Sequence, residues 1–389
     1  MTRNSNLLDR AADAAAVAAK YCDEVDAQSR FPTEAMQALK DARLMGIMIP
    51  RDLGGEAASL RDIAEVCALL GQNCASTAMV YAMHQIKVSS VVSHGADHPW
   101  HRAFMACIAS QQLLLGSSTT EGGGIGGDLG NSICAIERDG DEFTLRKDAS
   151  VISYATQCDA ILVTARRAPD APGSDQVMAT LLKSQYTLEK TAEWDTLGMR
   201  GTCSEGFIFE GRAPAEQIMP QPFAEIAARS MLAHAHLLWG ALWYGIAANA
   251  VSRAQSYVRA EARKKPGQNP VGALRVAEAA SMLQLMRSSL NAGLERFEKA
   301  QLANDDLNSM SFAIDMCNLK IGSSRLLNDI VQQAMMVCGI NGYKNGTPYS
   351  LGRHMRDAMS APLMINNDRI FGNTSNMLLV HRLDQRLAS

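Results

Sequence analysis

Apolar residues recur at three- and four-residue intervals from position 6 to about position 110, the spacing that places them on one face of an α-helix. Turns interrupt this pattern at 31–33 and at 49–55, where Pro and Gly occur. Thr33 is predicted to cap the helix that continues through 39–44. The first part of the chain is therefore predicted to be helical.

Between positions 113 and about 212 the pattern changes to short apolar runs separated by Gly, Asp, Pro and Ser clusters. Such runs predict β-strands, here at 113–115, 133–136, 160–165 and 206–209. Helical periodicity returns at Pro222 and persists to about Met336. This order predicts an α+β protein with three domains, which are a helical domain over 1–112, a β domain over 113–215 and a helical domain over 216–389.

Composition narrows the class of protein. The 389 residues carry a formal net charge of −3, so nucleic acid and membrane surfaces are not expected as partners. The most apolar stretch, 230–251, contains His234 and His236 and reads as a buried helix rather than a membrane span. Positions 1–21 are interrupted by charged residues and do not read as a signal peptide.

The sulfur-containing residues point to a reducing compartment and an adaptable interior. Nine cysteines, an odd number without any C-x-x-C pair, favour free thiols in a cytoplasmic protein and no metal site. Methionine is as frequent as all aromatic residues together, 21 of each. Because methionine fills irregular gaps, this balance favours packed helices.

A Gly-rich run at 121–128 contains a formal G-x-G-x-x-G match at Gly122, Gly124 and Gly127. A dinucleotide-binding fold would need a helix after it, whereas 131–147 predicts two strands joined by a turn. The run is interpreted either as a flexible β-turn or as a loop whose backbone N–H groups approach an anionic or ring-shaped ligand.

Other polar residues carry weaker signals. His234 and His236 lie two apart on a predicted helix and point in different directions, which favours core or interface histidines over a chelating pair. The basic turn at 263–267 is either a solvated loop or an anchor for a pyrophosphate or a CoA phosphate. His84 and Gln85 face a pocket, belong to the buried core or lie on the surface.

Seven segments, taken together and in order, resemble motifs of one family along nearly the whole chain. They are 46–55, ending in P-x-x-x-G-G; 76–79; 120–128, similar to T-E-P-x-x-G-S-D with one extra residue and no proline; 151–155, similar to W-I-[ST]-N-A; 197–202, similar to L-G-x-R-x-[ST]; Gln333 with 338–343; and 353–358, similar to R-x-x-R-D-A. The chain therefore resembles the acyl-CoA dehydrogenase family.

The resemblance implies a fold and a cofactor. The fold would comprise an N-terminal helical domain, a middle β-barrel-like domain and a C-terminal four-helix bundle, assembled as a dimer or tetramer. The cofactor would be FAD. The residues that the resemblance assigns to it are Thr120 and Ser153 at the isoalloxazine, Asp128 in the flavin loop, Arg263 at the pyrophosphate across the subunit interface, Gln333 and Gly339 near the adenosine half, and Thr374 and Asn376 beside the cofactor.

The resemblance also implies a reaction of fatty acid metabolism. An acyl-CoA or acyl-carrier-protein thioester would lose an α-proton to a carboxylate base while a β-hydride passes to flavin N5, and an electron-transfer flavoprotein or a reductase would take the electrons. This chain departs from the family at the base. The position of the usual glutamate holds Gly372, and the alternative position used by some relatives appears as Ala228, before Arg229.

The segment before Gly372 is longer than in the family because 360–369 is inserted. Asp368 is the nearest carboxylate and is the candidate for a relocated base. Its alternative interpretation is an ion pair with Arg369 or Arg356, or a helix cap. Three functions follow: a dehydrogenase with a displaced base, a flavin-dependent monooxygenase that needs no carboxylate base, and a non-catalytic flavoprotein or scaffold.

Overall fold

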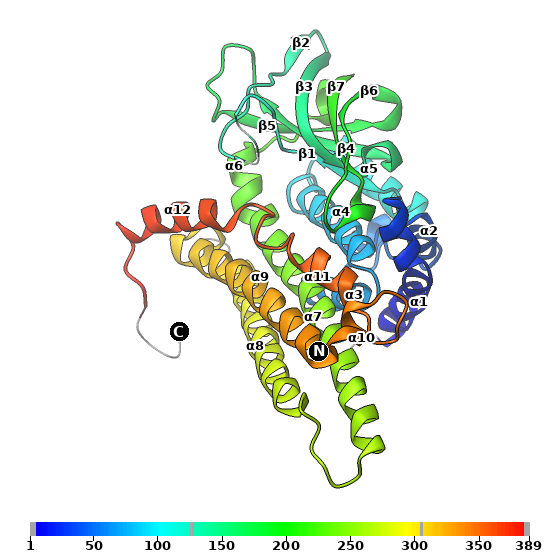
Figure 1. The fold of residues 1–389 in the computed structure, drawn as a ribbon. Helices are drawn as coiled ribbons and strands as arrows, with labels where there is room; N and C mark the ends of the chain where they lie inside the picture. The colour runs from blue at the N-terminus through cyan, green and yellow to red at the C-terminus, as the bar shows by residue number, and fades with distance from the viewer. Residues whose placement is uncertain (1–4, 125, 127, 304–305, 385–389) are drawn as a thin grey trace. The chain divides into compact units, whose positions relative to one another are not determined.

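The computed structural model describes residues 5–124, 126, 128–303 and 306–384 (Figure 1). The chain divides into two compact units. Unit 1 comprises residues 1–63, 76–196 and 200–235, and unit 2 comprises 64–75, 197–199 and 236–389.

The helices of the first hundred residues confirm the helical prediction. They are α1 (Ser5–Gln28), α2 (Thr33–Asp41), α3 (Leu60–Gly71), α4 (Ala75–His94) and α5 (Pro99–Gln111). The predicted cap of α2 is wrong. The carbonyl of Pro32 accepts the first helical hydrogen bond, from the amide of Met36, so Pro32 occupies the cap position and Thr33 is already helical.

Two sheets follow in unit 1 (Figure 1). The first has the order β1-β4-β5, with β1 (Leu115–Ser118) parallel to β4 (Ala160–Arg166) and β4 antiparallel to β5 (Gln176–Leu182). The second is antiparallel with the order β2-β3-β7-β6, formed by β2 (Glu137–Asp139), β3 (Glu142–Ser153), β7 (Ser204–Pro214) and β6 (Tyr186–Ala192). The predicted strands at 160–165 and 206–209 lie in β4 and β7, and the turn within 131–147 joins β2 to β3.

Three details of the strand prediction differ from the structure. Residues 133–136 form no named strand, because the carboxylate of Glu121 accepts the amides of Ile133 and Cys134, which a ladder would otherwise use. The first strand begins at Leu115 instead of position 113. The sequence prediction also lacks β5 and β6, and β6 is an exposed edge strand with a mostly polar sequence.

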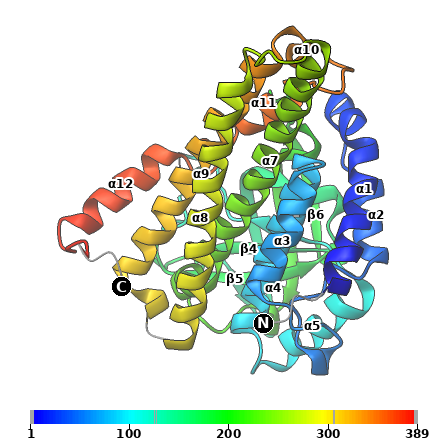
Figure 2. The ribbon, with the colours of Figure 1, turned by 90° about the horizontal axis from the view of Figure 1, so that it is seen from below.

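Unit 2 is built on three long helices that run alongside one another (Figure 2). They are α7 (Leu232–Lys264), whose first residues belong to unit 1, α8 (Ala273–Ala303) and α9 (Met310–Cys338). The shorter α10 (Ile340–Tyr343), α11 (Gly352–Ala358) and α12 (Asn367–Leu378) pack against α9 or continue from it. The predicted fold class, helical at both ends with a sheet region between, is confirmed, and the three domain ranges stay a prediction.

One helix of unit 1 departs from regular geometry. Between α6 (Phe223–Ile226) and α7, the five residues Ala227–Met231 form a π-helical turn, in which the amide of Leu232 bonds the carbonyl of Ala227. Such turns insert one extra residue into a helix and occur frequently at functional sites.

Two general findings concern membranes and cysteines. Within the part of the chain that the structure describes, no helix has both the length and the apolar character needed to cross a membrane. The nine cysteines are free thiols.

Candidate functional site

The predicted flavin residues of unit 1 begin with Thr120, just after β1. Its hydroxyl donates to the carbonyl of Val151 at 2.8 Å and is also 3.4 Å from the amide of Val151. These contacts join the start of the Gly-rich run to β3, two residues before Ser153. The structure therefore brings Thr120 close to the segment that carries Ser153.

Ser153 begins a chain of three hydroxyl groups. Ser153 is paired with Ser204 in the register of β3 and β7, and their Oγ atoms are 2.7 Å apart. Ser204 Oγ is 2.8 Å from Thr202 Oγ1. Two motifs that are about fifty residues apart in sequence, at 151–155 and 197–202, thus meet through their hydroxyl side chains.

Asp128 makes two local hydrogen bonds within its loop. Its Oδ1 accepts from the amide of Gly130 at 2.9 Å, and its Oδ2 accepts from the side-chain amide of Asn131 at 3.0 Å. Gly124 has a φ of +90° and nothing within 4 Å of the place where a Cβ would lie, so its backbone can approach a ligand closely. The third glycine of the formal match, Gly127, lies outside the described residues.

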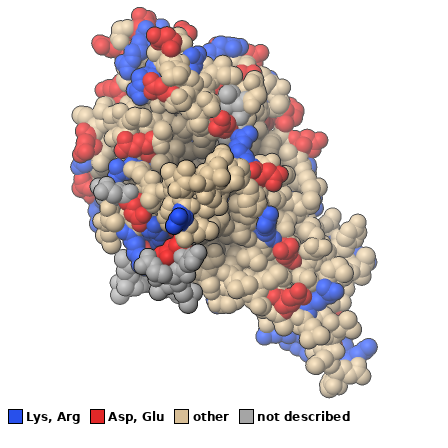
Figure 3. Space-filling view, turned by 90° about the vertical axis from the view of Figure 1, so that its left-hand side faces the viewer, with Lys and Arg blue, Asp and Glu red and all other residues tan. Residues whose placement is uncertain are grey.

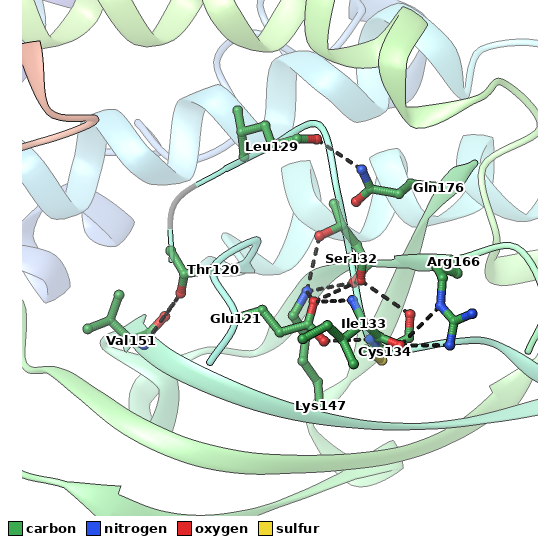
Figure 4. A network of polar contacts seen from close by, with 11 residues as sticks. Thr120, Glu121, Leu129, Ser132, Ile133, Cys134, Lys147, Val151, Arg166 and Gln176 are labelled. Atoms are coloured by element: carbon green, nitrogen blue, oxygen red, sulfur yellow. Dashed lines mark hydrogen bonds and ion pairs between the residues drawn. The ribbon is translucent and has the colours of Figure 1, made fainter. Parts of the chain in front are cut away.

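Glu121 is the residue of this loop that the sequence analysis gave no role. Its buried carboxylate accepts from the hydroxyl of Ser132 at 2.8 Å and from the amide of Ile133 at 3.0 Å (Figure 4). Lys147 of β3 lies beneath it, with Nζ 3.8 Å from Glu121 Oε2, and donates to the carbonyl of Thr164 at 2.7 Å. The Gly-rich run is thereby fixed to both sheets.

The predicted cofactor residues of unit 2 lie on α7, α9 and α12. Arg263 is exposed in the last turn of α7. Gln333 of α9 accepts a hydrogen bond from Arg275 at 2.8 Å, and Gly339 ends α9 with a φ of +52°. On α12, Thr374 is buried with its hydroxyl beside the thiol of Cys317, and Asn376 is exposed.

None of the candidate base positions presents a buried carboxylate that could remove a proton from carbon. Asp368 is exposed in the first turn of α12, and its amide donates to the side chain of the capping residue Asn366 at 2.8 Å. Gly372 has open space around it. In the π turn, Ala228 has no ionisable group, and Arg229 forms an ion pair with Glu225 at 3.5 Å. Whether Asp368 is the base stays a prediction.

Two other family-like segments meet in unit 2. The amide of Met199 donates to the carboxylate of Asp357 at 2.7 Å. A Cβ on Gly198 would lie 2.2 Å from the carbonyl oxygen of Arg356, so only glycine allows this approach. The segment 197–199 is therefore fitted directly onto α11.

His84 and its neighbour Gln85 lie in the buried core. His84 is fully buried, lies 2.9 Å from the carbonyl of Met45 through Nε2, and accepts the amide of Leu115 through Nδ1 at 3.0 Å. Burial lowers the pKa of His84 to about 4, so the ring is neutral. Gln85 also bonds Met45, at 3.1 Å. Of the three interpretations of this pair, the core one is confirmed.

His234 and His236 are both buried, and each ring bonds a different backbone carbonyl. His234 lies 2.8 Å from the carbonyl of Ser230 and His236 lies 3.0 Å from that of Met316. The interpretation as core histidines is confirmed.

Comparison with known proteins decides the family. The "Acyl-CoA dehydrogenase, N-terminal domain" matches residues 5–112, and the "Acyl-CoA dehydrogenase, C-terminal domain" matches residues 226–365. The chain belongs to the acyl-CoA dehydrogenase family. The two matches together cover well over half of its length.

Acyl-CoA dehydrogenases also appear among its relatives of known sequence. The probable acyl-CoA dehydrogenase YngJ of Bacillus subtilis is 24% identical over 345 residues, covering 87% of this chain and 88% of the relative. The short-chain specific mitochondrial acyl-CoA dehydrogenase of Homo sapiens is 26% identical, covering 86% of this chain and 79% of the relative.

Solved structures with the same fold include proteins named for other activities. FMN-bound TdsC from Paenibacillus sp. A11-2 superposes with a TM-score of 0.83 at 18% identity, covering 97% of this chain and 98% of the other. A nitrososynthase from Micromonospora carbonacea superposes with a TM-score of 0.82 at 18% identity, covering 96% of each chain. At this identity the likeness shows the fold alone.

The residues present fit the flavin cofactor of the acyl-CoA dehydrogenase family. In unit 1, Ser118 Oγ is buried without a partner at the end of β1, two residues before Thr120. In unit 2, Thr374 is buried on α12 beside the thiol of Cys317. Because buried hydroxyls normally find a hydrogen-bond partner, the Ser118 hydroxyl is suited to a ligand rich in oxygen and nitrogen.

Proposed function

We propose that this protein is a flavin-dependent oxidoreductase that oxidises an acyl thioester, carried by CoA or by an acyl carrier protein, to the α,β-unsaturated product. The flavin, FAD in this proposal, accepts the hydride. Family membership supports the reaction class. The observation that supports it in this protein is the hydroxyl chain from Ser153 through Ser204 to Thr202.

The role of the hydroxyl chain is to hold one wall of the flavin ring. Ser153 is half-buried and Ser204 is buried, so their geometry is set by strand pairing and not by solvent. Thr120 is fixed from the other side by Val151. A rigid set of donors and acceptors orients the ring before substrate arrives and excludes water from it.

An anaerobic titration tests the proposal. Purified protein reconstituted with FAD is mixed without oxygen with butyryl-, octanoyl- or palmitoyl-CoA, and absorbance in the flavin band is followed. Bleaching by at least one thioester is expected. Retained yellow colour with all three, and with the corresponding acyl carrier protein thioesters, would contradict the proposed reaction.

A monooxygenase is the second candidate, because neither base position carries a carboxylate: Gly372 and Ala228 replace it, and Asp368 is exposed. TdsC, a protein of the same fold, is a dibenzothiophene monooxygenase. Oxygen chemistry at a reduced flavin needs a reductase and no carboxylate base. Rapid oxygen consumption by the chemically reduced protein, without any response to thioesters, would favour this candidate.

We further propose that a second copy of the chain covers apolar residues of unit 2. The surface on the side of α12 shows a broad area with few charged side chains (Figure 3). Exposed apolar side chains of unit 2 include Leu274, Leu285, Leu302, Met336 and Leu379. Large exposed apolar patches mark interaction surfaces. Light scattering is expected to give a dimer or tetramer, and Leu285→Lys is expected to lower the assembled mass.

A further inference from the structure

Three lysines are buried in the described part of the chain, and they differ in what their amines contact. Lys147 donates to the carbonyl of Thr164 at 2.7 Å and lies near the carboxylate of Glu121. Lys320 donates to the side-chain oxygen of Asn367 at 2.8 Å. Lys87 has one hydrogen-bond partner among the described residues, the thioether sulfur of Met231 at 3.2 Å.

A thioether is a weak acceptor, so the amine of Lys87 has unused hydrogen-bonding capacity. Its side chain is only 4% exposed, which makes a lone ammonium costly at this place. A buried polar group in this condition calls for an explanation other than stability, because an apolar residue of the same length would fit better.

Lys87 lies beside a second titratable side chain, His94, and both contact the π turn. Lys87 and His94 are seven residues apart on α4 and share one face of that helix. They contact consecutive residues of the π turn, since His94 Nε2 is 3.2 Å from Ser230 Oγ and Lys87 reaches Met231. Ser230 and Met231 are both buried, so the Lys87 amine and the His94 ring meet the π turn away from bulk solvent.

Lys87 is also tied to the flavin segment of unit 1. One helical turn before it on α4, His84 accepts the amide of Leu115, the first residue of β1. That strand leads directly to Thr120. The helix that carries Lys87 is therefore hydrogen-bonded to the strand that positions the predicted flavin residue.

Among the described residues, no carboxylate forms an ion pair with the amine of Lys87, and burial alone shifts its pKa. The charged and titratable groups of this region face His94 instead: Glu225 and Arg229 from α6 and the π turn, and His234 from α7. Glu225 is paired with Arg229. Burial lowers the pKa of Lys87 to about 7, so much of the amine is neutral near physiological pH and has a free lone pair.

We propose that the amine of Lys87 is the general base that removes the α-proton of the thioester. The lone pair of Nζ forms an N–H bond as the α-carbon–hydrogen bond breaks, and the electron pair passes to the thioester carbonyl as an enolate. Lys87 becomes an ammonium and returns the proton to solvent after the product leaves. This assignment rests on the proposed thioester oxidation.

Proton exchange separates this step from hydride transfer. When the flavin is kept reduced with dithionite it cannot accept a hydride, yet a base can still exchange the α-hydrogens of octanoyl-CoA with solvent deuterium. The wild-type protein is expected to show this exchange by NMR, with a rate that rises with pH and levels off above about pH 7, as neutral amine accumulates.

Two variants identify the base. Lys87→Met keeps the length of the side chain without the amine, and is expected to lose at least about 100-fold in exchange rate while retaining flavin and the thioester-induced change in its spectrum. Lys299→Met, at an exposed position of α8, is the matched control and is expected to exchange like wild type. Exchange by Lys87→Met at the wild-type rate, or loss of exchange in Asp368→Asn, the competing candidate base, would overturn the assignment.

Failure of the proposed thioester reaction and failure of the Lys87 assignment give different results. If none of the three acyl-CoAs and none of the corresponding acyl carrier protein thioesters changes the flavin spectrum, bleaches the flavin or exchanges its α-hydrogens with the wild-type protein, the thioester reaction and with it the role of Lys87 are both rejected. If wild-type flavin is bleached but Lys87→Met exchanges normally, only the assignment of Lys87 is rejected.

Discussion

Lys147 Nζ lies 3.8 Å from Glu121 Oε2, and both side chains are almost completely buried. Glu121 lies at the start of the Gly-rich run and Lys147 in the middle of β3, so the pair connects the loop to the sheet beneath it. Removing one member of a buried pair leaves the other charge without compensation.

Glu121→Gln is therefore expected to lower the free energy of unfolding by about 3 kcal/mol, because an amide cannot accept all the backbone amides that the carboxylate accepts. It should also weaken flavin binding, measured by fluorescence titration. The control is Glu210→Gln, which removes an exposed partner of Arg146 and should change stability by less than about 0.5 kcal/mol in urea unfolding. Equal effects of the two substitutions would refute a special role for Glu121.

Lys87 gives a pH dependence with a definite sign. Its pKa is about 7 in the folded protein and 10.5 for the unperturbed group, so between these values the unfolded chain binds a proton that the folded protein lacks. Its contribution to the free energy of unfolding therefore increases with pH, by up to about 1.4 kcal/mol per pH unit.

Lys87→Met lacks this dependence. At pH 7 the variant is expected to be more stable than wild type, and the difference should shrink by about 2–3 kcal/mol between pH 7 and pH 9. Urea unfolding at several pH values measures it. A difference that stays constant with pH would mean that Lys87 is solvated and ordinarily charged.

The buried histidines make the free energy of unfolding depend on pH in the acidic range, below that of Lys87. Burial lowers the pKa of His84, His101, His234 and His236 to about 4 each, from an ordinary value of 6.5. Unfolding therefore takes up protons between these values, and stability falls as the pH drops from 6.5 towards 4. His84→Gln should reduce the slope of stability against pH by about 1.4 kcal/mol per unit near pH 5. An unchanged slope would show that His84 is not buried as described.

Two glycines make a matched test of backbone packing. Gly198→Ala is expected to destabilise unit 2 by several kcal/mol, because its Cβ would lie 2.2 Å from the carbonyl oxygen of Arg356, a backbone atom that cannot move aside. Gly322→Ala lies within α9 with nothing within 4 Å of the new Cβ, and should stabilise by about 0.5–1 kcal/mol. Thermal unfolding of both variants measures the contrast, and a stable Gly198→Ala protein would contradict the close approach.

The sequence predicts the order of helical and sheet regions because periodicity is a local property, visible within each segment. It does not predict β6, an edge strand without an apolar run, nor the irregular course of 133–136, which depends on the carboxylate of a residue twelve or thirteen positions away. Element boundaries and side-chain partners of this kind are set by tertiary contacts.

The candidate site follows the same division. Motif resemblance places Thr120, Ser153 and Asp128 in one loop and strand system, and their contacts in the structure suit that assignment. Lys87 carries no motif, and a single lysine in an apolar helix gives no sequence signal of its own. Its isolation becomes apparent only once burial and the contact with Met231 are known.

The π turn at Ala227–Met231 has a consequence for how positions correspond between relatives. A π turn holds one residue more than an α-helical turn, so a relative without it has one residue fewer at this place. Deleting one residue here would rotate everything before the turn by about 100° relative to α7. An alignment with such a relative that places no gap at the π turn would therefore match each residue before the turn to the neighbour of its true counterpart.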